Sequence, residues 1–367
     1  MRQVCSLAIV ILLGSSLFAT VRTVSNSPST LAQYNTIQAA IDASTSGDTV
    51  YIHGSPNVYA GFTIADKRLV ILGPGWRPDK VFPHQAQING TVAIGGTTGD
   101  PLTNPSNNTE IQGLTFLTTI QTYISHGNDH PNGLKFIRNE FSSLTLYLHE
   151  TGLYKDYVFE GNTFYNSQVY FNGSGNYQSF LFQNNIFYHT GGQNIYDLTN
   201  GNNSVIFDHN LWYGPSNTPV VCFAGTCRFL IITNNIFIRR NAATNNSFSV
   251  FNNNITWNAG TNNPWEVNSN SDGGGNVVNI DPAMVDQAAV NAGTYNPLLN
   301  FTIAAGQANN SGSDGKDMGL LFDASGSLNW TNSRNSRLPR IYSMNIANPT
   351  IPVNGSLNVT VEGRKSN

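Results

Sequence analysis

The chain has 367 residues and a net charge of −3, and 11% of its residues are charged, against roughly 25% in a typical soluble domain. The near-neutral charge gives no electrostatic basis for binding nucleic acid or an anionic membrane. The 20 Phe, 15 Tyr and 5 Trp argue against disorder and for a filled core. We therefore expect a folded chain whose polar surface is built mainly from Asn, Ser, Thr and Gly.

The first 20 residues have the layout of a secretory signal peptide. Arg2 supplies a positive charge, residues 7–13 form an apolar run, and a segment rich in small residues ends at Ala19. The apolar run is shorter than a membrane span, and no second one follows. We expect a secreted protein, extracellular or at the cell surface, with no integral membrane span after signal removal. An uncleaved N-terminal anchor is the alternative.

A pattern of apolar-x-apolar-x-x-Asn-x-aromatic recurs along the chain. Its copies and two weaker extensions place asparagines 23, 23, 25, 25, 19 and 22 residues apart, at Asn139, Asn162, Asn185, Asn210, Asn235, Asn254 and Asn276. Apolar residues at alternate positions indicate strands rather than helices. Asn marks a bend, and stacked Asn amides pair with one another. The pattern predicts a solenoid whose coils are stable only as a stack.

The coils, together with segments 34–43 (YNTIQAAIDA) and 47–52 (GDTVYI), resemble the right-handed β-helix proteins of the pectate-lyase-like superfamily. The resemblance implies an all-β fold, a right-handed parallel β-helix solenoid with a short N-terminal capping helix. The i, i+3, i+4 spacing of apolar residues in segment 34–43 also favours that helix. The stretch 279–319 resembles the closing segment of the family, so the resemblance covers about residues 34–320.

The chain divides into four predicted parts: a signal peptide (1–20), a parallel β-helix domain (34–322), a linker rich in Ser, Asn and Gly (323–337) and a C-terminal strand pair or tail (338–367). The last part is too short to make a good independent domain. It either docks on the β-helix or belongs to a β-sandwich or an export tag. We expect a monomer.

Two outward carboxylates are candidates for chemistry. Strand alternation places Glu160 and Asp208 in one column, two coils and roughly 10 Å apart, near the upper end of the separation in inverting glycosidases. Arg138 and His209 occupy the next column. Glu160, Asp208, Arg138 and His209 are therefore candidate catalytic residues. The alternative is a solvated face on which Glu160 and Arg138 form a surface salt bridge worth under about 1 kcal/mol.

A second outward column is aromatic and contains Tyr165, Tyr188, Tyr213 and Trp257. A row of exposed rings suits the apolar faces of sugars and usually marks a binding surface. These four residues are therefore candidates for substrate binding. The alternative is that a loop or the 338–367 tail covers them.

The mature chain keeps two cysteines, Cys222 and Cys227. An even pair in an exported protein is a disulfide candidate, although two buried thiols are equally consistent with the spacing. Two cysteines without a nearby histidine make only half of a zinc site, so we expect neither a metal nor another cofactor.

Enzymes of the superfamily combine a calcium-binding acidic cluster with a basic residue, or an Asp-Asp pair with a Gly-His-Gly element. This chain has neither Asp-Asp nor Gly-His-Gly, and no acidic cluster on consecutive coils. We expect an exported protein that engages extracellular polysaccharide, as a polysaccharide lyase, as a glycoside hydrolase or by binding alone. A non-catalytic surface adhesin or structural solenoid is the alternative.

Overall fold

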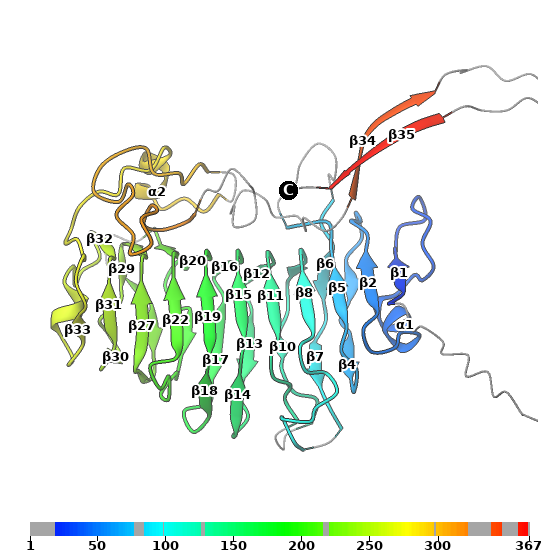
Figure 1. Cartoon of the computed structure of the whole chain (residues 1–367), viewed down its shortest axis with the longest axis horizontal. Coiled ribbons are helices and arrows are strands. Elements are labelled where there is room, and N and C mark those ends of the chain that lie inside the picture. The colour runs from blue at the N-terminus through cyan, green and yellow to red at the C-terminus, as the bar shows by residue number, and fades with distance from the viewer. Residues whose placement is uncertain are drawn as a thin grey trace, which may run out of the picture.

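The computed structural model describes residues 19–76, 84–97, 99–125, 129–215, 220–296, 299–321, 339–346 and 359–365. Of the predicted signal peptide only residues 19–20 fall within these ranges, and the predicted linker 323–337 lies outside them. Parallel strands wind into about nine turns of a solenoid, stacked side by side in Figure 1. The all-β parallel β-helix fold is therefore confirmed.

Three long parallel sheets form the sides of the solenoid. Sheet A contains, in spatial order, β1 (Val21–Val24), β2 (Thr49–Ile52), β5 (Val70–Leu72), β8 (Glu110–Gln112), β11 (Lys135–Ile137), β15 (Val158–Glu160), β19 (Phe180–Gln183), β22 (Val205–Asp208), β27 (Leu230–Thr233), β31 (Val250–Asn252) and β33 (Ser271–Asp272). Sheet B contains β3 (Tyr59–Ala60), β6 (Gln87–Asn89), β9 (Thr115–Phe116), β12 (Glu140–Ser142), β16 (Thr163–Tyr165), β20 (Ile186–Tyr188), β23 (Leu211–Tyr213), β28 (Ile236–Ile238) and β32 (Ile255–Trp257).

Sheet C and several short pairs complete the coils. Sheet C contains β4 (Thr63–Ala65), β7 (Val92–Gly95), β10 (Ile120–Gln121), β13 (Thr145–Leu148), β17 (Gln168–Phe171), β21 (Ile195–Tyr196) and β25 (Phe223–Ala224). Three further parallel pairs are β14 (Leu153–Lys155) with β18 (Asn176–Gln178), β24 (Val220–Val221) with β29 (Arg240–Asn241), and β26 (Cys227–Arg228) with β30 (Asn246–Ser247). An antiparallel pair, β34 (Pro339–Ile346) with β35 (Val359–Lys365), lies within the predicted C-terminal part.

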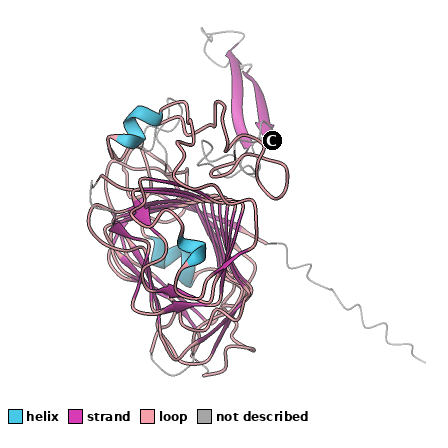
Figure 2. Cartoon of the chain, turned by 90° about the vertical axis from the view of Figure 1, so that its left-hand side faces the viewer, coloured by secondary structure: helices cyan, strands magenta, loops and turns pink. Residues whose placement is uncertain are grey.

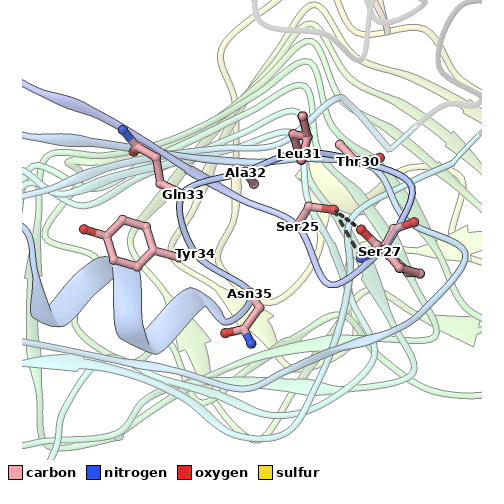
Figure 3. A pocket seen from close by; sticks show the side chains of 9 residues that line it. Ser25, Ser27, Thr30, Leu31, Ala32, Gln33, Tyr34 and Asn35 are labelled. Carbon is pink, nitrogen blue, oxygen red and sulfur yellow. Dashed lines mark hydrogen bonds between the residues drawn. The ribbon is translucent and has the colours of Figure 1, made fainter.

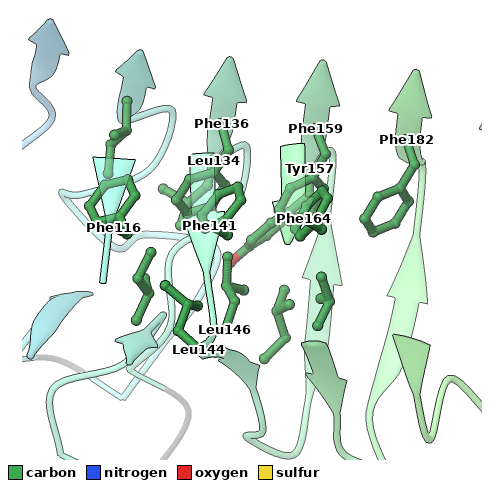
Figure 4. Close-up of a cluster of buried hydrophobic side chains, with 14 of the residues drawn as sticks. Phe116, Leu134, Phe136, Phe141, Leu144, Leu146, Tyr157, Phe159, Phe164 and Phe182 are labelled. Atoms are coloured by element: carbon green, nitrogen blue, oxygen red, sulfur yellow. The ribbon is translucent and has the colours of Figure 1, made fainter. Parts of the chain in front are cut away.

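The core is filled by aromatic rings that stack from coil to coil. In sheet A, Phe159 lies 5.2 Å from Phe136 and 4.5 Å from Phe182 between ring centroids. A second row on sheet B joins Phe116, Phe141 and Phe164 in the same way (Figure 4). Because parallel register places equivalent residues directly above one another, the repeated aromatic positions become continuous stacks.

The predicted asparagine ladder is present over its whole length. Each side-chain Nδ2 donates to the Oδ1 of the next ladder asparagine, at 2.9–3.2 Å from Asn139 to Asn276. Each Oδ1 from Asn162 onward also accepts from the backbone N–H of the preceding ladder residue. The amides thus satisfy the polar groups of a buried bend.

The predicted capping helix is confirmed as α1 (Ile37–Asp42). Thr36 is its N-cap, and the Thr36 hydroxyl accepts a hydrogen bond from the Ala39 N–H at 3.2 Å. Ile37, Ala40 and Ile41 are buried and belong to the main hydrophobic core. The helix therefore covers apolar side chains at the N-terminal end of the stack.

After the 3₁₀ turn η1 (Pro264–Glu266) and the last coil, the chain turns back along the outside of sheet B. We call residues 279–321, apart from 297–298, the closing segment; it includes α2 (Gln287–Asn291). Met284, Val290, Phe301 and Met318 of this segment pack against outward apolar residues of β20, β23, β28 and β32. Viewed along the solenoid, α2 lies outside the ring of sheets (Figure 2). Sheet B thus has a buried outer face over its C-terminal half.

Candidate functional site

The predicted carboxylate column is in register on sheet A. Glu160 aligns with Gln183, and Gln183 aligns with Asp208, so one glutamine separates the two carboxylates. The Gln183 amide donates to Asp208 Oδ2 at 2.8 Å, and Asn234 Nδ2 donates to Asp208 Oδ1 at 2.9 Å. Both oxygens of Asp208 are therefore occupied by neighbouring amides.

Arg138 and His209 lie directly after a strand of sheet A, not within it. They stand at the corner before the ladder asparagine, where the following residues from Gly113 onward have a positive φ: Gly113, Arg138, Gly161, Asn184, His209, Asn234, Asn253 and Gly275. Gly and Asn are the residues that tolerate this left-handed conformation, and a bulkier residue is strained there. Arg138 (φ 54°) and His209 (φ 52°) are the bulky members of this corner column.

His209 is buried beneath the closing segment, with 1% of its side chain exposed. Its Nδ1 lies 3.1 Å from the Gly319 carbonyl oxygen, and its Nε2 lies 3.4 Å from Asp314 Oδ2. Three asparagines of the same corner also bond this segment: Asn184 to Leu321, Asn234 to Ser313 and Asn253 to Ser311. The expectation that His209 faces an open surface is therefore wrong, because it helps to hold the closing segment on the corner.

Arg138 is also buried, so it is not an open surface group as predicted. Burial lowers the pKa of Arg138, and the Glu160 carboxylate opposes this effect. Burial likewise raises the pKa of Glu160, although the Arg138 charge partly offsets the rise. The charges of Glu160 and Arg138 therefore act on each other. Asp208 instead lies near His209, which contacts Asp314 of the closing segment.

The predicted aromatic column exists, but its centre is covered. Tyr188 and Tyr213 are buried at 4% and 0% exposure in the hydrophobic cluster under the closing segment. The Tyr188 hydroxyl donates to the Gly293 carbonyl at 2.9 Å. Tyr165 and Trp257 are partly buried, Tyr165 against Tyr295 at 4.3 Å and Trp257 through an indole hydrogen bond to Asn291. The prediction of an exposed aromatic column is therefore wrong for Tyr188 and Tyr213.

A different row of rings is partly exposed, on the outer face of sheet C. Tyr147, Tyr170 and Tyr196 align on β13, β17 and β21. The ring centroids of Tyr170 and Tyr196 lie 4.6 Å apart with planes within 11°, and those of Tyr147 and Tyr170 lie 5.6 Å apart. We call these three residues the tyrosine ladder. It occupies three consecutive coils, between Gln121 on β10 and Ala224 on β25.

Polar side chains flank the tyrosine ladder on both sides. Thr145 and Gln168 are partly exposed on the same face and align with each other. On the other side, the His149 ring lies 5.0 Å from the Tyr170 ring. Desolvation and the nearby Asp197 raise the pKa of Tyr170, so its phenol remains a hydrogen-bond donor at neutral pH. The face therefore combines aromatic rings with hydroxyl, amide and imidazole groups.

Sequence reasoning missed the tyrosine ladder because the predicted columns were counted from the ladder asparagines. The loop between sheets B and C differs in length from coil to coil, and the tyrosine spacings are 23 and 26 residues. A local signal was present: Tyr147, Tyr170 and Tyr196 each follow a buried aliphatic residue, and a buried apolar residue follows Tyr147 and Tyr170. Aligning that short motif instead of the asparagines would have found the ladder.

Glu140 is a further carboxylate that sequence reasoning missed. It lies at the start of β12, and its Oε1 accepts a hydrogen bond from the Tyr295 hydroxyl at 3.1 Å. Thr115 donates to the other oxygen at 3.4 Å. Burial raises the pKa of Glu140, and hydrogen bonds from Tyr295, Thr115 and Gln85 oppose the rise. The residue joins sheet B to the closing segment.

Of the two alternatives for the cysteine pair, the candidate disulfide is not formed. Cys222 and Cys227 are both free thiols and fully buried in the core. Burial raises the pKa of each thiol to about 12. The alternative of two buried thiols is therefore the one that the structure contains.

A shallow pocket of about 460 Å³ lies beside the loop that leads into α1 (Figure 3). Its lining includes Ser25, Ser27, Gln33, Tyr34 and Asn35. The Ser25 hydroxyl accepts from the Ser27 N–H at 3.2 Å and so serves the turn of the loop itself. Its lining residues include no carboxylate, histidine, lysine or arginine, which makes it a poor setting for acid–base chemistry.

Comparison with protein-family models finds no match to this chain, and comparison with curated proteins finds no similar sequence. Within the described ranges, no group of three or more His, Cys, Asp or Glu side chains is arranged to hold a metal ion. None of the helices described is long and apolar enough to cross a membrane.

Proposed function

We propose that this chain is an exported protein that holds extracellular polysaccharide on the tyrosine ladder of sheet C. The observation that carries the proposal is the alignment of Tyr147, Tyr170 and Tyr196 as partly exposed rings on three consecutive coils. Interior positions of the coils are already filled with stacked rings, so these outward tyrosines are not needed to fill the core. Partly exposed aromatic rings in a row offer apolar surface to the C–H faces of sugars.

The polar groups beside the tyrosine ladder suit the hydroxyls of a glycan. Phenol, amide and hydroxyl groups donate and accept hydrogen bonds without a fixed charge, so neutral sugars are accommodated as well as acidic ones. The resemblance to the pectate-lyase-like superfamily adds a fold-level analogy with carbohydrate-active proteins. The repeat along the solenoid favours an extended chain that contacts several coils at once, rather than a single small molecule.

The test is the retention of the purified mature chain on a panel of polysaccharides, compared with the triple variant Tyr147→Ala, Tyr170→Ala and Tyr196→Ala. We expect the triple variant to lose affinity by about tenfold or more, since each aromatic contact is worth roughly 0.5–1.5 kcal/mol and 1.4 kcal/mol is tenfold. Tyr51→Ala is the matched control, because Tyr51 is a partly exposed sheet A tyrosine beside His53. Equal retention of the triple variant and the native chain would contradict the proposal. No retention on any polysaccharide would favour the adhesin or structural solenoid.

A second candidate function is cleavage of the bound polysaccharide by Glu160. The observation that favours it is a carboxyl group with a raised pKa beside Arg138, which is held in a strained backbone conformation. A lyase or hydrolase would release shorter products, and Glu160→Gln would abolish them. Asp208→Asn is the control for a structural effect on the same column, because Asp208 accepts hydrogen bonds from Gln183 and Asn234. Retention without product release would leave binding as the whole function.

A further inference from the structure

The corner that leads into sheet A has its own column of left-handed residues. In register along the solenoid, the residues with positive φ at this corner are Gly47, Asn108, Gly133, Asp156, Ser179, Phe229, Phe248 and Ser269, whereas the aligned Arg68 and Ser204 have no positive φ. Six of these eight are Asn, Asp, Gly or Ser, the small or polar residues expected at such a bend. Two consecutive coils carry phenylalanine instead, at φ 59° and φ 55°.

Packing accounts only in part for these two phenylalanines. Phe229 is 38% exposed and Phe248 is 49% exposed, and their rings lie 5.6 Å apart with planes 25° from parallel. A bulky side chain in the left-handed region is strained, and a ring that stays 38–49% exposed recovers only part of that strain by burial. Strain that folding does not require is found most often at sites that bind ligands.

Neutral polar groups and one cation surround the pair. Asn202 and Asn203 are exposed on the preceding coil, and Asn268 and Ser269 are exposed on the following one. Arg228, the neighbour of Phe229, is also exposed, and no ion pair of Arg228 is found in the part of the chain that the structure describes. The corner therefore presents two rings, several amides and a guanidinium within four consecutive coils.

We propose that Phe229 and Phe248 form a second oligosaccharide-binding site, separate from the tyrosine ladder. The rings contact the C–H face of a sugar unit, the flanking amides bond its hydroxyls, and Arg228 bonds a carboxylate where the sugar is acidic. A protein partner fits less well, since a specific protein interface needs roughly 1,000 Å² with a packed apolar centre. The class of ligand rests on the proposed function, but the location rests on the two strained phenylalanines.

The experiment exchanges each phenylalanine for a residue that the same column uses elsewhere, Phe229→Asn with Phe248→Ser. Calorimetric titrations with cellohexaose, xylohexaose, chitohexaose and hexagalacturonate would compare this double variant with the native chain. We expect a tenfold or larger loss of affinity for at least one hexasaccharide, together with an unchanged or higher melting temperature because the strain is removed. Arg228→Gln should weaken hexagalacturonate alone if the guanidinium serves an acidic sugar.

Three results would overturn the inference: equal affinities of the double variant and the native chain, a lower melting temperature of the double variant, or no binding of any hexasaccharide by the native chain. The tyrosine triple variant separates the two sites. If that variant loses retention on polysaccharides while the phenylalanine variant binds normally, the result supports the proposed function and contradicts the second site. If the phenylalanine variant alone loses binding, the second site stands and the tyrosine ladder falls.

Discussion

The Tyr295 hydroxyl donates a hydrogen bond to the Glu140 carboxyl across 155 residues of sequence, at 3.1 Å. The contact ties the closing segment to the outer face of sheet B, where apolar packing gives way to polar groups. Glu140 is mostly surrounded by protein, and burial raises its pKa above the usual 4.5 despite the hydrogen bonds that it accepts. The carboxyl therefore destabilises the fold in its charged form.

The first prediction concerns Glu140→Gln. Because the pKa of Glu140 is raised in the folded state, its protonated carboxyl contributes stability that is fully present below pH 4.5. This contribution to the free energy of unfolding is lost as the pH rises through the folded pKa. Glutamine keeps an oxygen for the Tyr295 hydroxyl and carries no charge at any pH. We expect the variant to be more stable than the native chain at pH 7 and to lose this part of the pH dependence. Urea unfolding between pH 4 and pH 8 measures both effects.

Tyr295→Phe is the control for that prediction, because it removes the donor and leaves the carboxyl in place. Loss of one hydrogen bond to a buried carboxylate costs about 1–3 kcal/mol, so we expect lower stability at pH 7. A Glu140→Gln variant that is less stable than the native chain at pH 7 would show that the carboxylate is better solvated than its contacts indicate.

The second prediction concerns His209, which holds the closing segment through contacts near Gly319 and Asp314. His209→Asn introduces a residue that the corner column already uses, so it relieves backbone strain but gives up the reach to these partners. We expect the local opening of the closing segment to become about 1–2 kcal/mol easier. Limited proteolysis within residues 299–321 should then be roughly five- to thirtyfold faster.

Arg138→Asn is the matched control for His209→Asn, since Arg138 stands at the same corner but interacts with Glu160. We expect it to leave cleavage of the closing segment unchanged. Equal acceleration in the two variants would mean that the corner as a whole had loosened. No acceleration in His209→Asn would show that apolar packing alone holds the segment.

The asparagine ladder and the capping helix could be predicted from the sequence because each depends on a regular spacing of residues along the chain. An asparagine at the same position of seven consecutive coils has the same neighbours above and below, so the sequence period predicts its hydrogen bonds. Ile37, Ala40 and Ile41 similarly predict the buried face of α1 from their spacing. In both cases the residues that make the deciding contacts can be recognised by their spacing in the sequence.

The covering of sheet B could not be predicted in the same way. Tyr188 and Tyr213 alternate with core residues as exposed positions do, and what buries them comes from residues about 75–130 positions later, such as Val290 and Met318. The burial of His209 could not be predicted for the same reason, since its partner Gly319 lies 110 residues away in the sequence. Strand alternation assigns a face to each side chain but does not say whether another segment lies on that face.

The third prediction concerns the two free cysteines. Because burial raises the pKa of Cys222 and Cys227 to about 12, almost no thiolate is present at pH 8. We expect the mature native chain to resist alkylation by iodoacetamide at pH 8 and to react at both thiols in 8 M urea without a reductant. Mass spectrometry counts the adducts. Thiols that react in urea only after reduction would establish a disulfide and contradict the structure.

The fourth prediction tests the ladder at its centre against its end. Asn185 donates to Phe159 and Asn210 and accepts from the Asn162 side chain and backbone, so Asn185→Ala leaves several buried groups without partners. Each such group costs about 1–3 kcal/mol, and we expect a total loss of at least about 3 kcal/mol in the free energy of unfolding. Asn276→Ala is the comparison, because Asn276 is partly exposed at the last rung and water can replace its amide. Chemical unfolding should therefore show a much smaller loss for Asn276→Ala. Equal losses would mean that the ladder contributes through backbone geometry at the bend rather than through its buried hydrogen bonds.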